Sequence, residues 1–254
     1  MTELKYLVVI HDFHGFWTHH PHRAARAFLH AWLDVVGERP SAELILQILN
    51  RPPSLSVRQM AVDLVICRGF PEKAEAIRKA VKHYYDRVYI PNHRLRETVQ
   101  TLNKLGVRQV LLTNGELRKV VPIVSAWGLA ALLEGIVGKG SGIGLKPGVD
   151  IVGSILKPLE INVDHRKRCL VVGDYWQDIE TAQRNKMDSA LLVTGSGQQF
   201  PKEAIRRGVI PTYLLLEPFE LVAAVLGQNL RTSERLELML GEGLSTMITK
   251  IWQH

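Results

Sequence analysis

The sequence predicts an α/β fold, a three-layer sandwich with a mostly parallel sheet, interrupted by an inserted all-helical segment. Short apolar runs rich in β-branched residues recur along the chain, and amphipathic stretches separate most of them, as in βαβ units. The runs are apolar throughout, which is typical of strands that helices cover on both faces. The region from residue 18 to residue 89 contains no convincing strand, which indicates the insertion.

The strands are predicted from apolar runs that end at glycine or polar residues. In order, they are Tyr6–Ile10, Gln109–Leu112, Gly135–Val137, Leu170–Val172, Ser189–Val193 and Thr212–Leu216. An amphipathic helix at Pro91–Gly106 is expected directly before the second strand. This alternation predicts a Rossmann-like core at residues 1–17 and 90–228.

The inserted segment at residues 18–89 is predicted to be a helical domain. Apolar residues recur at helical spacing in Ala24–Val36, Ala42–Leu49, Val57–Cys67 and Glu72–Val88. Ser41 and Ser56 precede two of these stretches and are suited to begin helices. Residues 229–254 form a further amphipathic stretch beyond the core, for which we expect a helix that packs on the core or joins a homodimer.

The composition favours a globular protein with anionic ligands. The formal net charge is +7, yet basic residues form only short clusters, so nucleic-acid binding is not the favoured interpretation. No apolar run reaches the roughly 18–20 residues of a membrane helix. The N-terminus leads directly into a strand rather than a signal peptide. Cys67 and Cys169 lie far apart in apolar surroundings and are expected to be buried free thiols, which fits the cytoplasm.

Residues with catalytic chemistry follow the predicted strands. Asp12 ends the first strand, Thr113 ends the second, and Asp174 and Asp178 follow the fourth, while Lys146 follows a glycine-rich loop. Open α/β sheets bind ligands outside the carboxyl ends of their strands. We therefore expect a carboxylate, a hydroxyl, a lysine and an acidic pair to meet at one edge of the sheet.

These motifs resemble those of the haloacid dehalogenase-like (HAD) hydrolases. The resemblance lies in their order and spacing: Asp12-Phe13-His14-Gly15, Thr113-Asn114-Gly115, Gly144-Leu145-Lys146-Pro147 and Gly173-Asp174-Tyr175-Trp176-Gln177-Asp178. The resemblance covers residues 4–226. Within the family, the chain is similar to the phosphoglycolate phosphatase-like branch, which places a helical cap after the first motif. The resemblance implies a hydrolase with a Rossmann-like core and a cap.

The resemblance also implies roles for individual residues. Asp12 corresponds to the nucleophile, and Lys146 to the lysine that neutralises charge between nucleophile and phosphoryl group, with Lys139 as the alternative lysine. The phosphoryl group would be held by three residues of the second motif together with this lysine, namely Thr113, Asn114, Gly115 and Lys146. Mg²⁺ would be held by Asp12, the backbone carbonyl of His14, Asp174 and Asp178, because this ion prefers oxygen ligands.

The first motif departs from the family at two positions. His14 stands where the phosphatases carry their acid/base aspartate, and Phe16 stands where they carry threonine. Imidazole titrates near neutral pH, so His14 can serve as the replacement acid/base. Phe16 and Trp17 introduce aromatic bulk that could narrow or fill the site. We expect the histidines that surround this motif to be exposed loop residues: His11, His14, His19, His20 and His22.

These observations predict a Mg²⁺-dependent phosphohydrolase that acts on a small phosphorylated metabolite through an aspartyl-phosphate intermediate. The alternative is a catalytically impaired HAD-like protein that acts in binding or assembly. The loss of two positions in the first motif favours the alternative, whereas the intact acidic pair of Asp174 and Asp178 favours the enzyme. That pair also argues against the haloacid dehalogenases themselves, which need no metal.

Overall fold

The chain folds into two compact units, each with its own hydrophobic core. A computed structural model describes residues 3–50, 55–161, 163–193 and 207–228. The first unit, called the core unit, spans residues 1–17 and 92–254, and the second, the helical unit, spans residues 18–91. The predicted helix at residues 229–254 lies outside the described residues.

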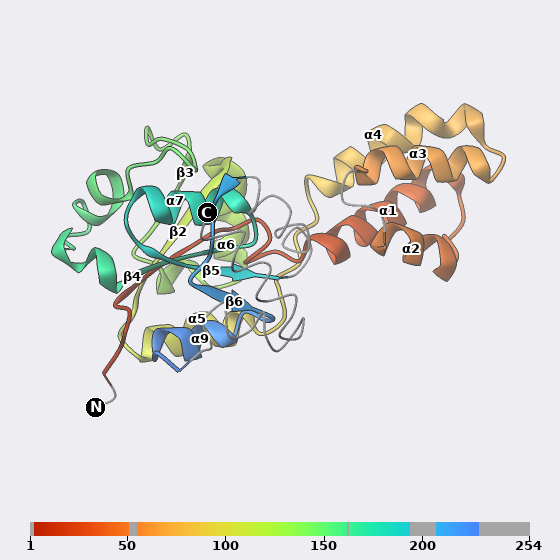
Figure 1. Ribbon diagram of the computed structural model, residues 1–254. Helices are drawn as coiled ribbons and strands as arrows, with labels where there is room; N and C mark the ends of the chain where they lie inside the picture. Colours follow the sequence, from red (N-terminus) through yellow and green to blue (C-terminus); the bar gives the residue numbers. More distant parts are fainter. Residues whose placement is uncertain (1–2, 51–54, 162, 194–206, 229–254) are drawn as a thin grey trace. The chain divides into compact units, whose positions relative to one another are not determined.

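The core unit is built on a six-stranded parallel sheet with the strand order β3-β2-β1-β4-β5-β6. The strands are β1 (Val8–His11), β2 (Arg108–Glu116), β3 (Gly135–Lys139), β4 (Cys169–Gly173), β5 (Asp188–Leu192) and β6 (Tyr213–Leu215). Helices lie on both faces of this sheet (Figure 1). The predicted α/β, Rossmann-like fold is therefore confirmed.

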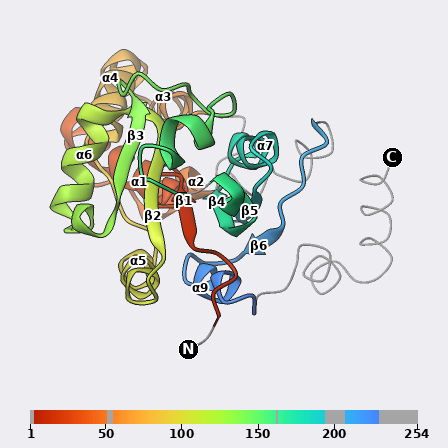
Figure 2. The same ribbon diagram turned by 90° about the vertical axis from the view of Figure 1, so that its left-hand side faces the viewer.

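The helices of the core unit follow the strands in the βαβ pattern. They are α5 (Leu95–Lys104), α6 (Leu117–Ala126), α7 (Trp176–Arg184) and α9 (Glu220–Val225), with short helical turns η2 (Ala130–Leu132), η3 (Val152–Leu156) and η4 (Val163–Arg168). The views from two directions place α5 beside α9 on one face of the sheet and α7 on the other (Figure 2).

The central strand β1 supplies side chains to both layers because successive residues of a strand point to opposite faces. Val8 and Ile10 pack in a cluster with Ile151 and Leu156 of the segment before β4. His11 points to the other face, where its Nε2 lies 3.1 Å from Oε1 of Gln109. All four residues of β1 are buried, so the end of this strand is a rigid place for a functional residue.

The chain reverses the direction in which it adds strands at β1. The strands β2 and β3 lie on one side of β1, whereas β4, β5 and β6 lie on the other. Such a switch point leaves a crevice outside the carboxyl ends of the strands, where ligands bind in open α/β sheets. The residues that follow β1, β2 and β4 therefore border this crevice.

The helical unit contains α1 (His20–Val36), α2 (Ala42–Leu49), α3 (Val57–Cys67), η1 (Pro71–Lys73) and α4 (Ala74–Tyr85). The Oγ atoms of Ser41 and Ser56 accept backbone N–H bonds at the starts of α2 and α3, as predicted. The helix α1 begins earlier than predicted, because Nδ1 of His19 accepts the N–H of His22. Histidine is an unusual cap, so the sequence carried no clear signal for this start.

Two further expectations need correction. The strand β2 continues to Glu116 and contains the Thr113–Gly115 motif, with an irregular register after Leu112. The strand, predicted to end at Leu112, thus includes this motif. Cys67, expected to be buried, is exposed at the end of α3, whereas Cys169 is a buried free thiol.

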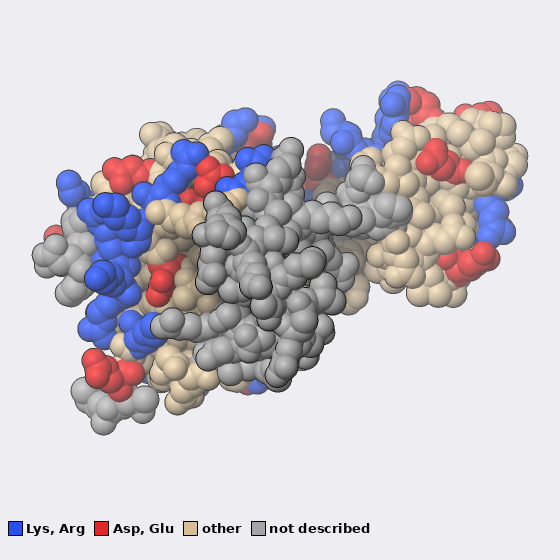
Figure 3. Space-filling view, in the orientation of Figure 1, with Lys and Arg blue, Asp and Glu red and all other residues tan. Residues whose placement is uncertain are grey.

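The surface reflects the basic balance of the chain. Lys and Arg side chains gather along one edge of the core unit in the view of Figure 3, with acidic side chains among them. No helix among the described residues is long and apolar enough to cross a membrane.

Candidate active site

Three buried carboxylates meet at the carboxyl edge of the sheet. Asp12 directly follows β1, Asp174 directly follows β4, and Asp178 lies in the first turn of α7. Their exposed fractions are 5%, 3% and 2%. One oxygen from each carboxylate lies within 4.8 Å of the others, so the three groups could share a single cation.

Two glycines leave the space that these carboxylates occupy. A Cβ atom on Gly15 would lie 1.9 Å from Cγ of Asp174, and one on Gly173 would lie 2.1 Å from Oδ2 of Asp178. Gly15 also has φ of +94°, a conformation that residues with a side chain rarely adopt. The glycines of the first and fourth motifs are therefore required by the packing of the carboxylates.

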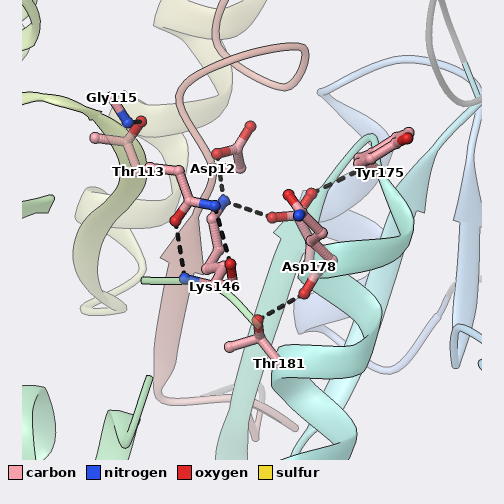
Figure 4. Close-up of polar contacts among 9 residues, drawn as sticks. Asp12, Thr113, Gly115, Lys146, Tyr175, Asp178 and Thr181 are labelled. Atoms are coloured by element: carbon pink, nitrogen blue, oxygen red, sulfur yellow. Dashed lines mark hydrogen bonds and ion pairs between the residues drawn. The ribbon is translucent and has the colours of Figure 1, made fainter. Parts of the chain in front are cut away.

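Lys146 supplies the positive charge at the centre of the site. Its Nζ donates to Oδ1 of Asp12 and, at 2.5 Å, to Oδ1 of Asp178, as Figure 4 shows. The side chain is only 4% exposed. Burial opposes the charge on Lys146, but the two carboxylates outweigh burial and raise the pKa of its ammonium group. Lys146 is therefore protonated at neutral pH.

For the two carboxylates that Lys146 contacts, burial outweighs the attraction of the lysine. It raises the pKa of Asp12 above its usual range, against the lowering effect of Lys146. It also raises the pKa of Asp178 to about 6, and the nearby charge of Asp12 adds to this effect. One cation does not fully compensate two buried carboxylates, so the site favours additional positive charge.

The fourth motif also holds the carboxylate of Asp178 by hydrogen bonding. Its Oδ2 accepts the backbone N–H of Tyr175 at 3.1 Å, while its other oxygen faces Lys146. This arrangement places a carboxylate at the N-terminus of α7, where the helix dipole stabilises negative charge. The position of Asp178 is thus determined by its own helix.

The second motif lies along the end of β2 beside this centre. Thr113 is fully buried, and its Oγ1 accepts the N–H of Gly115 at 3.0 Å. The amide of Asn114 binds the backbone of Lys146 in both directions. Asn114 therefore faces the lysine loop, and a phosphoryl contact by its side chain remains a prediction.

His14 lies against the second motif. A Cβ atom on Gly115 would lie 2.9 Å from Nε2 of His14 and 3.2 Å from Oγ1 of Thr113. The imidazole is half-buried and packs edge-on against the ring of Phe13, with ring centres 5.0 Å apart. The replacement residue of the first motif is therefore placed beside the hydroxyl that is predicted to hold the phosphoryl group.

The aromatic residues after the first motif pack beside β1. The rings of Phe16 and Trp17 are fully buried and lie 5.7 Å and 5.8 Å from the ring of His11. His11 itself is fully buried, which corrects the expectation of an exposed loop residue. Burial lowers its pKa to about 3, so its imidazole is neutral. The aromatic bulk therefore fills the layer next to His11 and Gln109.

The pattern of motifs did not identify Asn92, which stabilises the first motif. Its Nδ2 donates to the carbonyl oxygens of Gly15 and Phe16, each at 2.7 Å, and the residue is 6% exposed. It lies where the chain returns from the helical unit, next to a proline. In the sequence, this position is the one signal that could have identified Asn92.

The three carboxylates of Asp12, Asp174 and Asp178 are chemically suited to bind a magnesium ion. All three are hard oxygen donors that converge within one ion's reach, and the raised pKa values of Asp12 and Asp178 indicate too little positive charge. Mg²⁺ is usually bound by one or two carboxylates together with water and substrate oxygens. The residues present are therefore suited to this ion.

Comparison with known proteins agrees with this architecture. The family model described as haloacid dehalogenase-like hydrolase matches residues 9–192, well over half of the chain. No curated protein matches the sequence.

The solved structures that resemble this chain share its fold at low sequence identity. A HAD-superfamily hydrolase of subfamily IA from Geobacter sulfurreducens is 14% identical with a TM-score of 0.60, covering 88% of this chain and 98% of its own. The HAD-hydrolase YfnB from Bacillus subtilis, crystallised with magnesium, is 15% identical with a TM-score of 0.61, covering 87% and 99%. A predicted phosphoglycolate phosphatase from Haemophilus somnus is 17% identical with a TM-score of 0.56, covering 87% and 98%.

Proposed function

Because this chain belongs to the haloacid dehalogenase-like hydrolases, we propose that it is a Mg²⁺-dependent phosphohydrolase of a small phosphorylated metabolite. The observation that carries this proposal is the buried Asp12, which contacts Lys146 and lies within reach of two further carboxylates. A strand-end carboxylate in this setting can attack phosphorus.

The proposed reaction has two steps at phosphorus. A carboxylate oxygen of Asp12 forms a bond to phosphorus while the bond to the ester oxygen breaks, and His14 gives a proton to the leaving alcohol. Neutral His14 then takes a proton from water, whose oxygen attacks phosphorus and releases inorganic phosphate from Asp12. General acid–base help of this kind is worth about 10²–10⁴-fold in rate.

The remaining residues would stabilise the charge that spreads over the phosphoryl oxygens. Lys146 lies within hydrogen-bond reach of Asp12 and carries a fixed positive charge. The hydroxyl of Thr113 accepts from Gly115, and its own O–H would donate to a phosphoryl oxygen. Such preorganised groups act strongly in a site that excludes water.

Asp12, Asp174 and Asp178 are the side chains that would hold the ion, with the backbone carbonyl of His14 as a further ligand. Mg²⁺ would supply positive charge next to the phosphoryl oxygens, in addition to the charge of Lys146. The carboxylates would orient their oxygens toward that charge, and Gly15 and Gly173 leave them the room to do so.

A panel of phosphate esters, assayed with Mg²⁺ and with a chelator, tests the proposal. The wild type, Asp12→Asn and His14→Asp should be compared, with Asp86→Asn, an exposed aspartate of the helical unit, as the matched control. We expect metal-dependent turnover that Asp12→Asn abolishes and Asp86→Asn leaves unchanged.

The same panel separates the enzyme from the alternative of an impaired binding protein. Turnover by His14→Asp together with none by the wild type would sink the proposed function, because the histidine would then be the cause of inactivity. Turnover by the wild type that His14→Ala reduces, without loss of the folded state, would support the acid/base role of the imidazole.

A further inference from the structure

The backbone of Lys146 lies in a tight turn that other side chains hold in place. The N–H of Gly148 donates to the carbonyl of Leu145 at 2.8 Å and closes the turn. Oδ1 of Asn114 accepts the N–H of Lys146 at 2.8 Å, and its Nδ2 donates to the carbonyl of Lys146 at 3.0 Å. One amide therefore satisfies both backbone groups of the lysine.

A second amide holds the chain just after this turn. Asn185 ends helix α7, and its Oδ1 accepts the N–H of Ile151 at 2.9 Å. Its Nδ2 donates to the carbonyl oxygens of Val149 at 3.0 Å and Thr181 at 2.9 Å. The side chain is buried, with 7% of the residue exposed, so these contacts do not compete with bulk water.

Helix α7 thus contacts the lysine loop at both of its ends. Asp178 in the first turn accepts from Nζ of Lys146, and Asn185 at the last turn binds the backbone three and five residues further along the loop. The amide uses both of its N–H groups and its oxygen. A carboxylate cannot make the two donated bonds, and an apolar side chain of the same shape makes none.

We propose that Asn185, together with Asn114, is a positioning residue that acts through Lys146. The two amides hold the loop in the conformation that places Nζ between Asp12 and Asp178. The consequence for catalysis rests on the proposed phosphohydrolase function, whereas the consequence for the position of Lys146 does not.

The kinetic test uses two variants and one control. Asn185→Leu removes all three bonds, Asn185→Asp keeps the acceptor for Ile151, and Asn103→Asp changes an exposed asparagine of α5. We expect kcat to fall roughly a hundredfold in Asn185→Leu, because a displacement of a catalytic group by about 1 Å can have that effect. KM should change much less, and Asn103→Asp should behave as the wild type.

A double-mutant comparison shows whether Asn185 acts through the lysine. If it does, Asn185→Leu should add little to the loss of kcat in Lys146→Met, because the positioned group is already absent. An equal further loss in that background would overturn the proposal, since it would show that Asn185 acts on another part of the site.

An acylation footprint tests the position of Lys146 without any activity. Acetic anhydride labelling, read by peptide mass spectrometry, should spare Lys146 in the wild type and modify it in Asn185→Leu, with the exposed Lys82 as the internal reference. Should Asn185→Leu fail to fold, Asn185→Asp carries the test with partial labelling. Protection of Lys146 in folded variants overturns the proposal. Labelling of Lys146 in Asn185→Leu but not in the wild type, together with no phosphatase activity in the wild type, contradicts the proposed function alone.

Discussion

Replacement of Lys146 by methionine tests whether the buried charges of the site depend on one another. The side chains of Lys146, Asp12 and Asp178 are 4%, 7% and 3% exposed. Removal of one partner from such a buried group destabilises a protein by about 3–5 kcal/mol, because the remaining charges stay buried without compensation. We expect a loss of this size in Lys146→Met at pH 8 without metal.

The loss should shrink as the pH falls. The pKa of Asp178 is raised in the folded state, to about 6 with Lys146 present, and removal of Lys146 raises it further. A carboxyl whose folded pKa exceeds its unfolded value binds its proton more tightly when folded, so its stability penalty grows as the pH rises. Between pH 8 and pH 6 the difference between variant and wild type should therefore fall by roughly 1.4 kcal/mol per pH unit for one proton.

Urea unfolding followed by circular dichroism, in the presence of a chelator, measures both quantities. Lys139→Met is the matched control, because Lys139 is exposed in β3 and its replacement should stay within about 0.5 kcal/mol of the wild type. A loss below about 1 kcal/mol at pH 8, or an equal loss at pH 8 and pH 6, would show that the buried charges do not depend on one another in this way.

Two further predictions concern the surroundings of the carboxylates. The pKa of the buried His11 is lowered to about 3, so its share of the stability is complete above its unfolded pKa and is lost as the pH falls. Between pH 8 and pH 5.5, the free energy of unfolding measured in urea titrations should therefore fall by about 1.4 kcal/mol less in His11→Phe than in the wild type. An equal fall in both proteins would contradict the lowered pKa. Gly15→Ala should lower the melting temperature far more than Gly37→Ala, because both have φ near +95° but only the first Cβ would meet Asp174. Equal shifts in the two alanine variants would show that backbone strain, rather than this contact, explains the glycine.

The sequence predicted those parts of the site that lie at strand ends. Asp12 and Asp174 each follow an apolar run, and the glycine or polar residue that ends the run shows where each strand stops. Parallel strands then bring their carboxyl ends to one edge, which explains why Asp12, Lys146 and Asp178 meet despite their distance in the sequence. The apolar runs of the strands and the parallel topology of the sheet are together sufficient to predict this part of the site.

The parts that the sequence did not predict depend on single contacts between distant residues. Gln109 meets His11 across 98 positions, and Asn185 meets Ile151 across 34. Neither contact has a periodicity or spacing that marks it. His11 was expected among exposed loop histidines because its neighbours suggested a loop, whereas the strand extends through it and buries its ring. The packing of the complete core is needed to find such residues.

Phosphorylation of Asp12 in a metal-dependent reaction is the step on which the proposed function depends. Sodium borohydride reduces an acyl phosphate to the alcohol, so treatment of the protein during turnover of acetyl phosphate should convert Asp12 to homoserine, which peptide mass spectrometry detects. We expect this conversion with Mg²⁺, its absence with a chelator, and no conversion of Asp174 or Asp178. Turnover of the substrate with an unmodified Asp12 would contradict this step.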